Sequence, residues 1–256
     1  MTMIKEFLKD HLQVKIYSNR REMGISAAKM AAQGLKELLR QKDEVNIIFA
    51  AAASQLEFLE AIVLEKDIEW VRVNAFHMDE YTGLPVAHPQ RFGNFLNERI
   101  FSKLPLKKVY YLNEEGNDTE AESIRYAALL QKMPPDITFM GIGENTHLAF
   151  NDPHVADFND PVLVKIIDLD EPCKLQQVHD GCFATVADVP SYAYTLTIPA
   201  LLQSAYIFCM VPGKNKAQAV KHTLTEAISA KYPSTSLRDH ADAILFLDQD
   251  SAVLIL

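Results

Sequence analysis

The chain has 256 residues, of which 48% are hydrophobic and 23% charged, and its formal net charge is -9. A chain of this size can bury a substantial core, and its negative charge disfavours nucleic acid and anionic membranes as partners. No stretch approaches 18 uninterrupted apolar residues, so no membrane-spanning helix is expected. The three cysteines lack CxxC spacing and the charged N-terminus lacks the apolar core of a signal peptide, which together predict a cytoplasmic protein.

Apolar, strand-like runs alternate with helix-period segments along the chain. Strands are predicted at 14–17, 45–50, 70–76, 109–112, 136–142, 162–167, 192–198, 205–211, 243–247 and 252–256. Helices are predicted at about 19–41, from Ser54, at about 89–103, after a Thr119 cap, and at about 214–230. This alternation predicts an α/β fold with a mainly parallel sheet, whereas 151–191 shows little periodicity. No linker-like stretch divides the chain, so we expect a single domain over 1–256.

Ligands of parallel α/β sheets bind beyond the carboxyl ends of the strands, so polar residues after each apolar run are candidates for a site. Ser54 follows one run, with Glu57 three residues later. Ser54 therefore either caps the next helix in a capping box or offers a phosphate site at that helix start. Asn19 and Glu22 show the same capping-box spacing at the first helix.

Asp79 and Glu80 stand just past the run at 70–76. An adjacent pair of acids is commonly solvated in a loop, but a carboxylate shielded from water at this place can act as a general base. His77 and Asp79 also resemble half of a metal site, although no second cluster completes it.

Glycines at 141 and 143 follow the run at 136–142 and permit close backbone approach. His147 comes next, between Asn145 and Asp152. A lone histidine is more often structural than catalytic, but its place at a strand end among polar neighbours favours a proton-transfer role.

Lys214 and Lys216 begin the helix after the run at 205–211, where cations oppose the helix dipole. We expect Lys214 to turn into water and Lys216 to contact an anion such as phosphate.

Two stretches, "FHMDEYTGLPVAHPQRFGNFLNERIF" and "FMGIGENTHLAFNDP", resemble the glucosamine-6-phosphate deaminases (isomerases), which share a superfamily with the 6-phosphogluconolactonases. The strand–helix order fits along nearly the whole chain, and "LAFNDP" resembles the deaminase branch. The resemblance implies a Rossmann-like three-layer sandwich with a mainly parallel central sheet. It also implies an enzyme that needs no metal or cofactor and acts on a small phosphorylated sugar. Monomers, dimers and hexamers occur in the family, so a homo-oligomer stays open.

The resemblance also implies roles for particular residues. Asp79 is the base that moves a proton between C2 and C1 of the sugar. His147 assists ring opening, and Asn145 and Asp152 orient it. Substrate contacts, including the phosphate, are implied for Ser54, Gly143 and Lys216.

Three features depart from the family pattern. Asn145 stands where the family usually has Asp, and Asp152 where it has Glu. The phosphate loop, usually rich in glycine and threonine, is three alanines at 51–53 followed by a serine. The region of the family's phosphate-binding arginine, "QQVHDGCF", holds only His179 as a basic residue. Two other functions stay open. One is a lactonase that uses His147 to activate water and does not need Asp79. The other is a sugar-phosphate sensor without activity, which the altered loop and Asn145 favour.

Overall fold

The computed structural model describes residues 2–116 and 120–256, so the predicted cap at Thr119 lies outside the described residues. Its strands are β1 (Met3–Lys9), β2 (Leu12–Tyr17), β3 (Val45–Phe49), β4 (Val73–His77), β5 (Asp79–Tyr81), β6 (Lys108–Tyr110), β7 (Ile137–Met140), β8 (Val164–Asp168), β9 (Tyr192–Leu196), β10 (Tyr206–Val211) and β11 (Ala243–Asp248). Its α-helices are α1 (Arg20–Gln41), α2 (Leu56–Ile62), α3 (Phe92–Arg99), α4 (Glu120–Lys132), α5 (Glu171–His179), α6 (Ile198–Leu202) and α7 (Ala217–Thr225).

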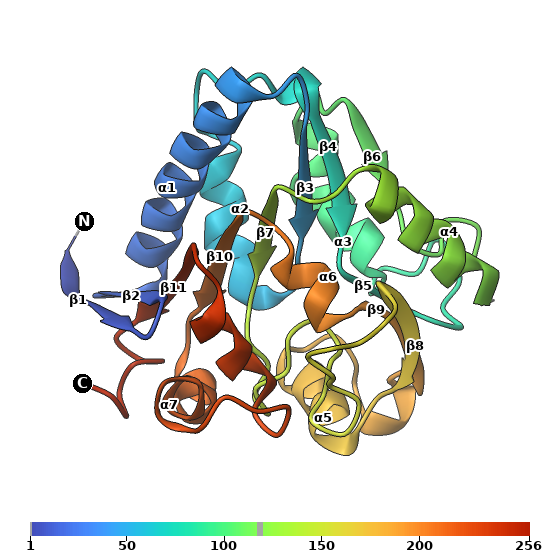
Figure 1. The fold of residues 1–256 in the computed structure, drawn as a ribbon. Coiled ribbons are helices and arrows are strands. Elements are labelled where there is room, and N and C mark those ends of the chain that lie inside the picture. The colour runs from blue at the N-terminus through green and yellow to red at the C-terminus, as the bar shows by residue number, and fades with distance from the viewer. Residues whose placement is uncertain (1, 117–119) are drawn as a thin grey trace.

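The predicted α/β fold with a mainly parallel central sheet is confirmed (Figure 1). Within the described residues, eight strands form this sheet in the order β1-β2-β11-β10-β7-β3-β4-β6. Every neighbouring pair is parallel except β1 with β2, which form an antiparallel hairpin at one edge. The carboxyl ends of the parallel strands therefore meet at one edge of the sheet, where a ligand site is expected.

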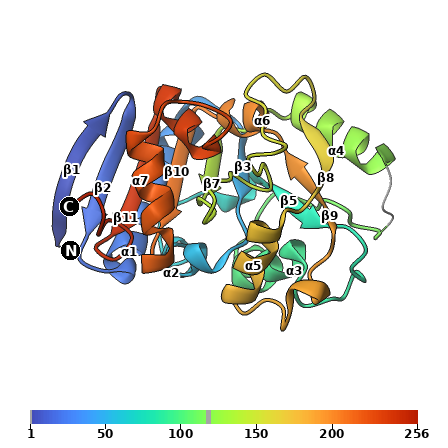
Figure 2. The same cartoon turned by 90° about the horizontal axis from the view of Figure 1, so that it is seen from below.

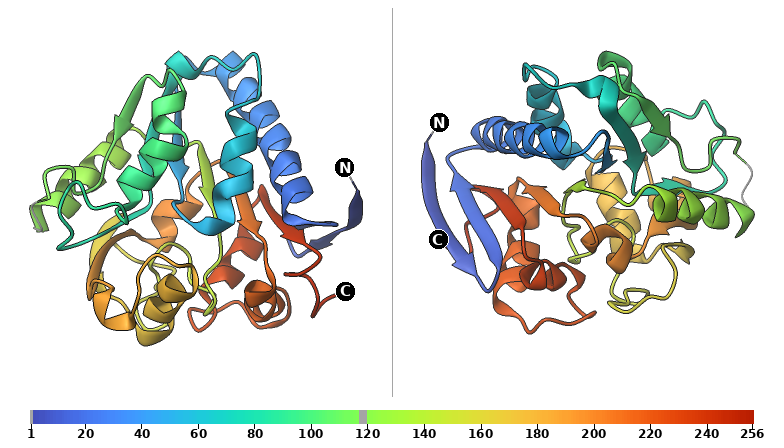
Figure 3. Two further views of the ribbon diagram at one scale, coloured as in Figure 1. Left: turned by 180° about the vertical axis from the view of Figure 1, so that it is seen from behind. Right: turned by 45° about the horizontal axis from the view of Figure 1, so that its top comes forward.

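Helices cover both faces of the central sheet and complete a three-layer sandwich. One core packs α1, α2 and α3 against the sheet, and these helices lie in front of the strands in the left view of Figure 3. The other core packs α4, α6 and α7 against the opposite face. The strands are buried on both faces, which explains why they read in the sequence as continuous apolar runs.

Helix α1 begins as the sequence predicts, because the Asn19 side chain accepts a hydrogen bond from the Glu22 N–H at 2.9 Å. The Glu22 carboxylate accepts from the Ser18 hydroxyl at 2.8 Å. The Asn19 cap is thus present, but the Glu22 carboxylate accepts from Ser18 and not from the Asn19 N–H, as a capping box would require. Small side chains on the buried face allow the helix to pack closely on the sheet, namely Ala27, Ala28, Ala31 and Ala32.

A second, antiparallel sheet of order β5-β9-β8 lies beyond the carboxyl ends of the central strands. It contains the strands predicted near 162–167 and 192–198, together with the unpredicted β5. Together with α5 it encloses a separate small core that includes Tyr81 and Phe150. Seen from below in Figure 2, α5 and α7 lie on either side of the end of β7.

One strand prediction was wrong, one began three residues too early, and two strands, β1 and β5, were missed. Residues 252–256 form turns, and Leu254 and Leu256 expose about half of their surface, because no neighbouring strand pairs with this segment. Residues Trp70–Arg72 form a 3₁₀ turn before β4 begins. Of the two missed strands, β1 carries charged residues and is mostly exposed, so its sequence lacks the apolar run of a buried strand. No described helix is both long and apolar enough to cross a bilayer.

Candidate active site

A cavity of about 130 Å³ opens at the carboxyl ends of β3, β4, β7 and β10, under α5. Five of the predicted site residues line it, namely Ser54, Asp79, Gly143, His147 and Lys216. The other two, Asn145 and Asp152, are not on its wall and contact His147 from the protein side. Residues from four separate loops are thus brought to one cavity by the parallel sheet.

Asp79 occupies the point where the chain passes from one sheet to the other. β4 ends at His77 in the central sheet, and β5 begins at Asp79 in the small sheet. The Met78 N–H donates to the Phe49 carbonyl at 3.3 Å, and its carbonyl accepts from the Leu196 N–H at 2.8 Å. Met78 is therefore hydrogen-bonded to both sheets, and Asp79 follows it at the junction between them.

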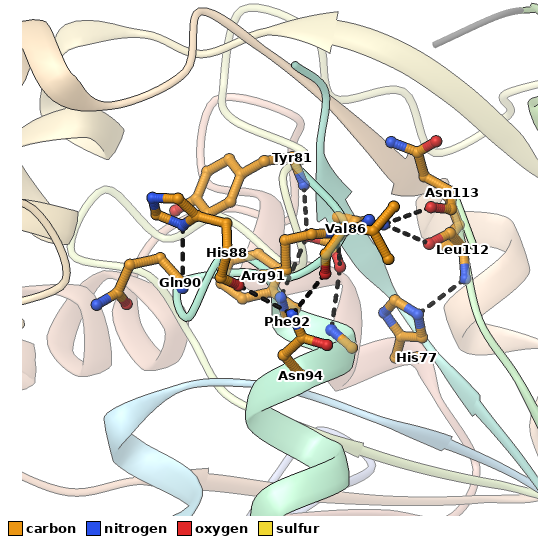
Figure 4. Close-up of polar contacts among 12 residues, drawn as sticks. His77, Tyr81, Val86, His88, Gln90, Arg91, Phe92, Asn94, Leu112 and Asn113 are labelled. Carbon is orange, nitrogen blue, oxygen red and sulfur yellow. Dashed lines mark hydrogen bonds and ion pairs between the residues drawn. The ribbon is translucent and has the colours of Figure 1, made fainter. Parts of the chain in front are cut away.

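The buried His77 fixes the backbone of Asp79. Its Nε2 accepts from the Leu112 N–H at 2.9 Å, as Figure 4 shows, so Nδ1 carries the proton and donates to the Asp79 carbonyl at 2.9 Å. Burial lowers the pKa of His77 from 6.5 to about 4, and the ring is neutral at physiological pH. Because both ring nitrogens serve the backbone, the resemblance of His77 and Asp79 to half of a metal site has no structural basis.

The Asp79 side chain is about 8% exposed, at the cavity wall. Burial, and then the negative charge of Glu80, raise its pKa well above the ordinary 3.8. A carboxylate in this state binds a proton far more readily than a solvated one, which suits general base catalysis.

The neighbouring Glu80 is fully buried and takes no part in the cavity. Its carboxylate lies 3.4 Å from Nε of Arg91. It also accepts hydrogen bonds at 2.9, 3.1 and 3.0 Å from the N–H groups of Tyr81, Phe92 and Gly93. Figure 4 shows how these contacts tie the start of α3 to β5. The two adjacent acids of the sequence are therefore a cavity carboxylate and a structural anchor, and neither is solvated.

His147 is held from behind by a carboxylate. Its Nδ1 lies 2.7 Å from Oδ1 of Asp152, which is completely buried. Burial by itself would raise the pKa of Asp152, but the charge and hydrogen bond of His147 and the Asn145 amide outweigh burial and lower it below 3.8. The carboxylate is thus ionised, and it orients the imidazole whose ring lines the cavity.

Asn145 does not contact the imidazole. Its Nδ2 donates to Asp152 at 3.0 Å and to Asp170 at 3.3 Å, and its Oδ1 accepts from the His147 N–H at 3.2 Å. An amide here joins two carboxylates that would otherwise repel each other. Asn145 therefore orients His147 through the backbone and through Asp152.

The two glycines of the turn are required by contacts. A Cβ at Gly143 would lie 2.3 Å from the His147 ring, and one at Gly141 would lie 2.9 Å from Ser54 Oγ. Any larger residue would displace the imidazole or the serine hydroxyl.

Ser54 is not a helix cap, which is one of the two roles that the sequence leaves open for it. It lies inside the 3₁₀ turn Ala53–Gln55 before α2, and the helix start shows no side-chain cap. The buried Gln55 instead donates from Nε2 to Ser54 Oγ, Met140 O and Met210 O at 2.9, 3.2 and 3.3 Å. Gln55, which sequence reasoning missed, thus joins the serine to the ends of β7 and β10.

Lys216 is about 5% exposed and lines the cavity, and its ammonium has no hydrogen bond or ion pair among the described residues. Burial lowers its pKa, while the nearby Asp180 and Glu144 act in the opposite direction. Lys214 is exposed, as predicted. The preceding turn Lys214–Lys216 is 3₁₀, and α7 ends at Thr225, earlier than predicted.

One cluster beside the cavity has the residue types of a metal site. His147, Asp152 and Cys173 offer ligand atoms within 4.8 Å of one another, and Asp152, His154 and Asp170 form a second such group. Burial raises the pKa of the Cys173 thiol well above 9.0, which disfavours the thiolate that soft metals bind. His147 and Asp152 already contact each other, so these donors fit a proton-transfer pair better than a metal centre.

An α/β sheet with buried acid, histidine and lysine side chains at its carboxyl edge defines a small-molecule site of the kind found in many enzymes. A sequence model of the family described as "Glucosamine-6-phosphate isomerases/6-phosphogluconolactonase" matches residues 18–246, and the chain belongs to this family.

The glucosamine-6-phosphate deaminase of Listeria monocytogenes is 32% identical over 212 residues, which cover 83% of this chain and 88% of that protein. The enzyme of the same name from Streptococcus uberis is 33% identical over 203 residues, or 79% and 84% of the two chains. The solved structure of a monomeric glucosamine-6-phosphate deaminase superposes with a TM-score of 0.85 at 26% identity, covering 94% of this chain and 99% of the other. The 6-phosphogluconolactonase of Thermotoga maritima shares the fold, with a TM-score of 0.75 at 20% identity over 93% and 99% of the chains.

Proposed function

We propose that this protein is an amino-sugar phosphate deaminase/isomerase, which converts a hexosamine 6-phosphate and water to a ketohexose 6-phosphate and ammonia. The observation that carries the proposal is the shared cavity of Asp79, His147 and Lys216, with a raised pKa at the carboxylate. The deaminase names of the sequence relatives support the same reaction.

In this mechanism His147 transfers a proton to the ring oxygen of the sugar as the ring opens and the aldehyde forms at C1. Asp152 and Asn145 hold the imidazole in the orientation that this transfer needs. Asp79 then removes the proton from C2 and returns it to C1, while the C1 oxygen gains a proton and the C2 nitrogen loses one, which converts the amino aldehyde to an imine at C2. Water adds to the imine carbon, and the nitrogen leaves as ammonia.

The backbone lock on Asp79 suits this role. The His77 ring and the Met78 backbone fix the main chain at Asp79, so the Asp79 carboxylate needs little reorganisation to reach two adjacent carbons of the sugar. We propose that Ser54 and Lys216 bind the phosphate and that the glycine at 143 leaves room for the sugar beside the histidine. The three unpaired cysteines suit a reducing cytoplasm.

The test is ammonia release from purified protein given glucosamine, galactosamine and mannosamine 6-phosphates. Hydrolysis of 6-phosphogluconolactone, measured in parallel, separates the deaminase from the lactonase reaction. Calorimetry with the same hexosamine phosphates separates both from a sensor. Tight binding without ammonia from any of them, or lactone hydrolysis alone, would reject the proposed reaction.

A further inference from the structure

An arginine that is distant in sequence from the predicted phosphate contacts lies on the cavity wall beside residues 51–54. Arg20 is the first residue of α1. Its Nη2 donates to the Ala53 carbonyl at 3.0 Å and to Oε2 of Glu57 at 3.0 Å, and its Nε pairs with the other oxygen of Glu57. The guanidinium is therefore held against the loop that carries Ser54.

Local stability does not explain this placement. A cation at the start of a long helix opposes the helix dipole. The ion pair with Glu57 is partly solvated, with side-chain exposures of 45% for Arg20 and 22% for Glu57, and such pairs contribute little. A residue that breaks a local preference is commonly held for function.

Near Lys216 the negative charges outnumber the single ammonium group, so a bound phosphate would need a second cation. Lys216 is buried without a partner among the described residues, but the carboxylates of Asp180 and Glu144 act on it. His179, the basic residue in the region of the family's arginine, pairs with Glu144 at 3.4 Å and is not on the cavity wall. A phosphate dianion bound by Lys216 would therefore meet two carboxylates unless another cation faced them.

We propose that Arg20 is a phosphate ligand that takes the place of the missing arginine, together with Lys216. Nη1 of Arg20 has no partner among the described residues, so its N–H groups remain for an anion. Glu57 holds the guanidinium in position and, as a competing anion, weakens its hold on the phosphate. The assignment rests on the proposed function for the identity of the phosphorylated ligand.

The experiment measures binding of inorganic phosphate to the full-length protein by calorimetry, a readout that does not need turnover. Arg20→Gln is expected to weaken phosphate binding about tenfold or more, the effect of losing a charge-assisted hydrogen-bonding group. Arg21→Gln is the matched control, because Arg21 is the adjacent arginine on the same helix, is exposed and is not on the cavity wall. Glu57→Gln is expected to tighten binding, and Arg20→Lys to give an intermediate affinity because the planar fork is lost.

The outcomes separate this inference from the proposed reaction. Equal phosphate affinity in wild type and Arg20→Gln, an equal loss in Arg21→Gln, no phosphate binding to wild type, or weaker binding in Glu57→Gln would each overturn the assignment of Arg20. A loss confined to Arg20→Gln, with unchanged melting temperature, would support it. The wild-type protein could also fail to release ammonia from every hexosamine phosphate. In that case a loss of phosphate binding in Arg20→Gln would still identify Arg20 as an anion ligand, but the deaminase proposal would be rejected.

Discussion

At the end of the cavity that holds Asp79 and His147, buried neighbours fix the Asp79 backbone and the His147 ring. At the end that holds Ser54 and Lys216, the loop at 51–54 is only half-buried and the cations face carboxylates. The resemblance implies the family's residue types at the first end apart from Asn145 and Asp152, whereas at the second end it implies glycines and an arginine that this chain does not have. The comparison indicates that proton transfer tolerates little change in geometry, while an anion can be held by cations from several places.

The largest expected effect is at the first end. Asp79→Asn should lower the rate of deamination about 10²- to 10⁴-fold, the range for removing a general base. The same change should raise thermal stability at pH 7. The pKa of Asp79 is raised in the folded state, so the carboxyl group contributes stability at low pH that is lost as the pH rises through that pKa. The amide of the variant does not ionise and avoids this loss.

Parallel activity assays and thermal melts of wild type and Asp79→Asn check both effects. A variant that keeps its activity would remove Asp79 from the mechanism. A lower melting temperature would contradict the burial argument.

The structural acid gives the second prediction. Glu80→Gln should destabilise the fold by about 1–3 kcal/mol, because the amide cannot accept from all the backbone N–H groups and leaves Arg91 without its charged partner, while burial, which raises the pKa of Glu80, reduces the loss. Denaturant unfolding measures this, with Glu114→Gln as a control at an acid of the same region. A small loss at Glu80 would show that the anchor at α3 is weaker than its burial indicates.

Acid should weaken the backbone lock on Asp79. The pKa of His77 falls to about 4 in the folded protein from 6.5, so the neutral ring contributes stability above pH 6.5 that is lost as the pH falls toward 4. That shift corresponds to roughly 3 kcal/mol. The difference in unfolding free energy between wild type and His77→Asn, followed from pH 7 to pH 4, isolates the effect. Parallel curves for the two proteins would exclude His77 as its source.

The smallest effect separates this chain from the family pattern. Asn145→Asp restores the family's residue but replaces an amide donor by a third carboxylate beside Asp152 and Asp170. We expect the variant to lose about 1–3 kcal/mol of stability from the unmade hydrogen bonds. We also expect the kcat/KM of the variant to be lower at pH 8 than at pH 6. A pH profile of both proteins measures this, and higher activity in the variant at every pH would contradict it.

The sequence predicted the parallel sheet because its strands are buried on both faces and read as apolar runs. It also predicted which loops meet, since the carboxyl ends of parallel strands share one edge. It did not predict β5 or α5, because three residues and a weakly periodic segment carry too little signal. Gln55 and Arg20 were missed for another reason, since their contacts lie with residues far along the chain and neither stands in a recognisable motif.

Met78 is the only residue between the two sheets at the point where the chain enters β5. A substitution remote from the cavity, in β8 or β9, would therefore be transmitted to Asp79 without any flexible joint to absorb it. Efforts to change the substrate by redesigning α5 or its supporting sheet should alter turnover together with selectivity, whereas redesign at residues 51–54 should act first on phosphate binding, which is proposed for Ser54.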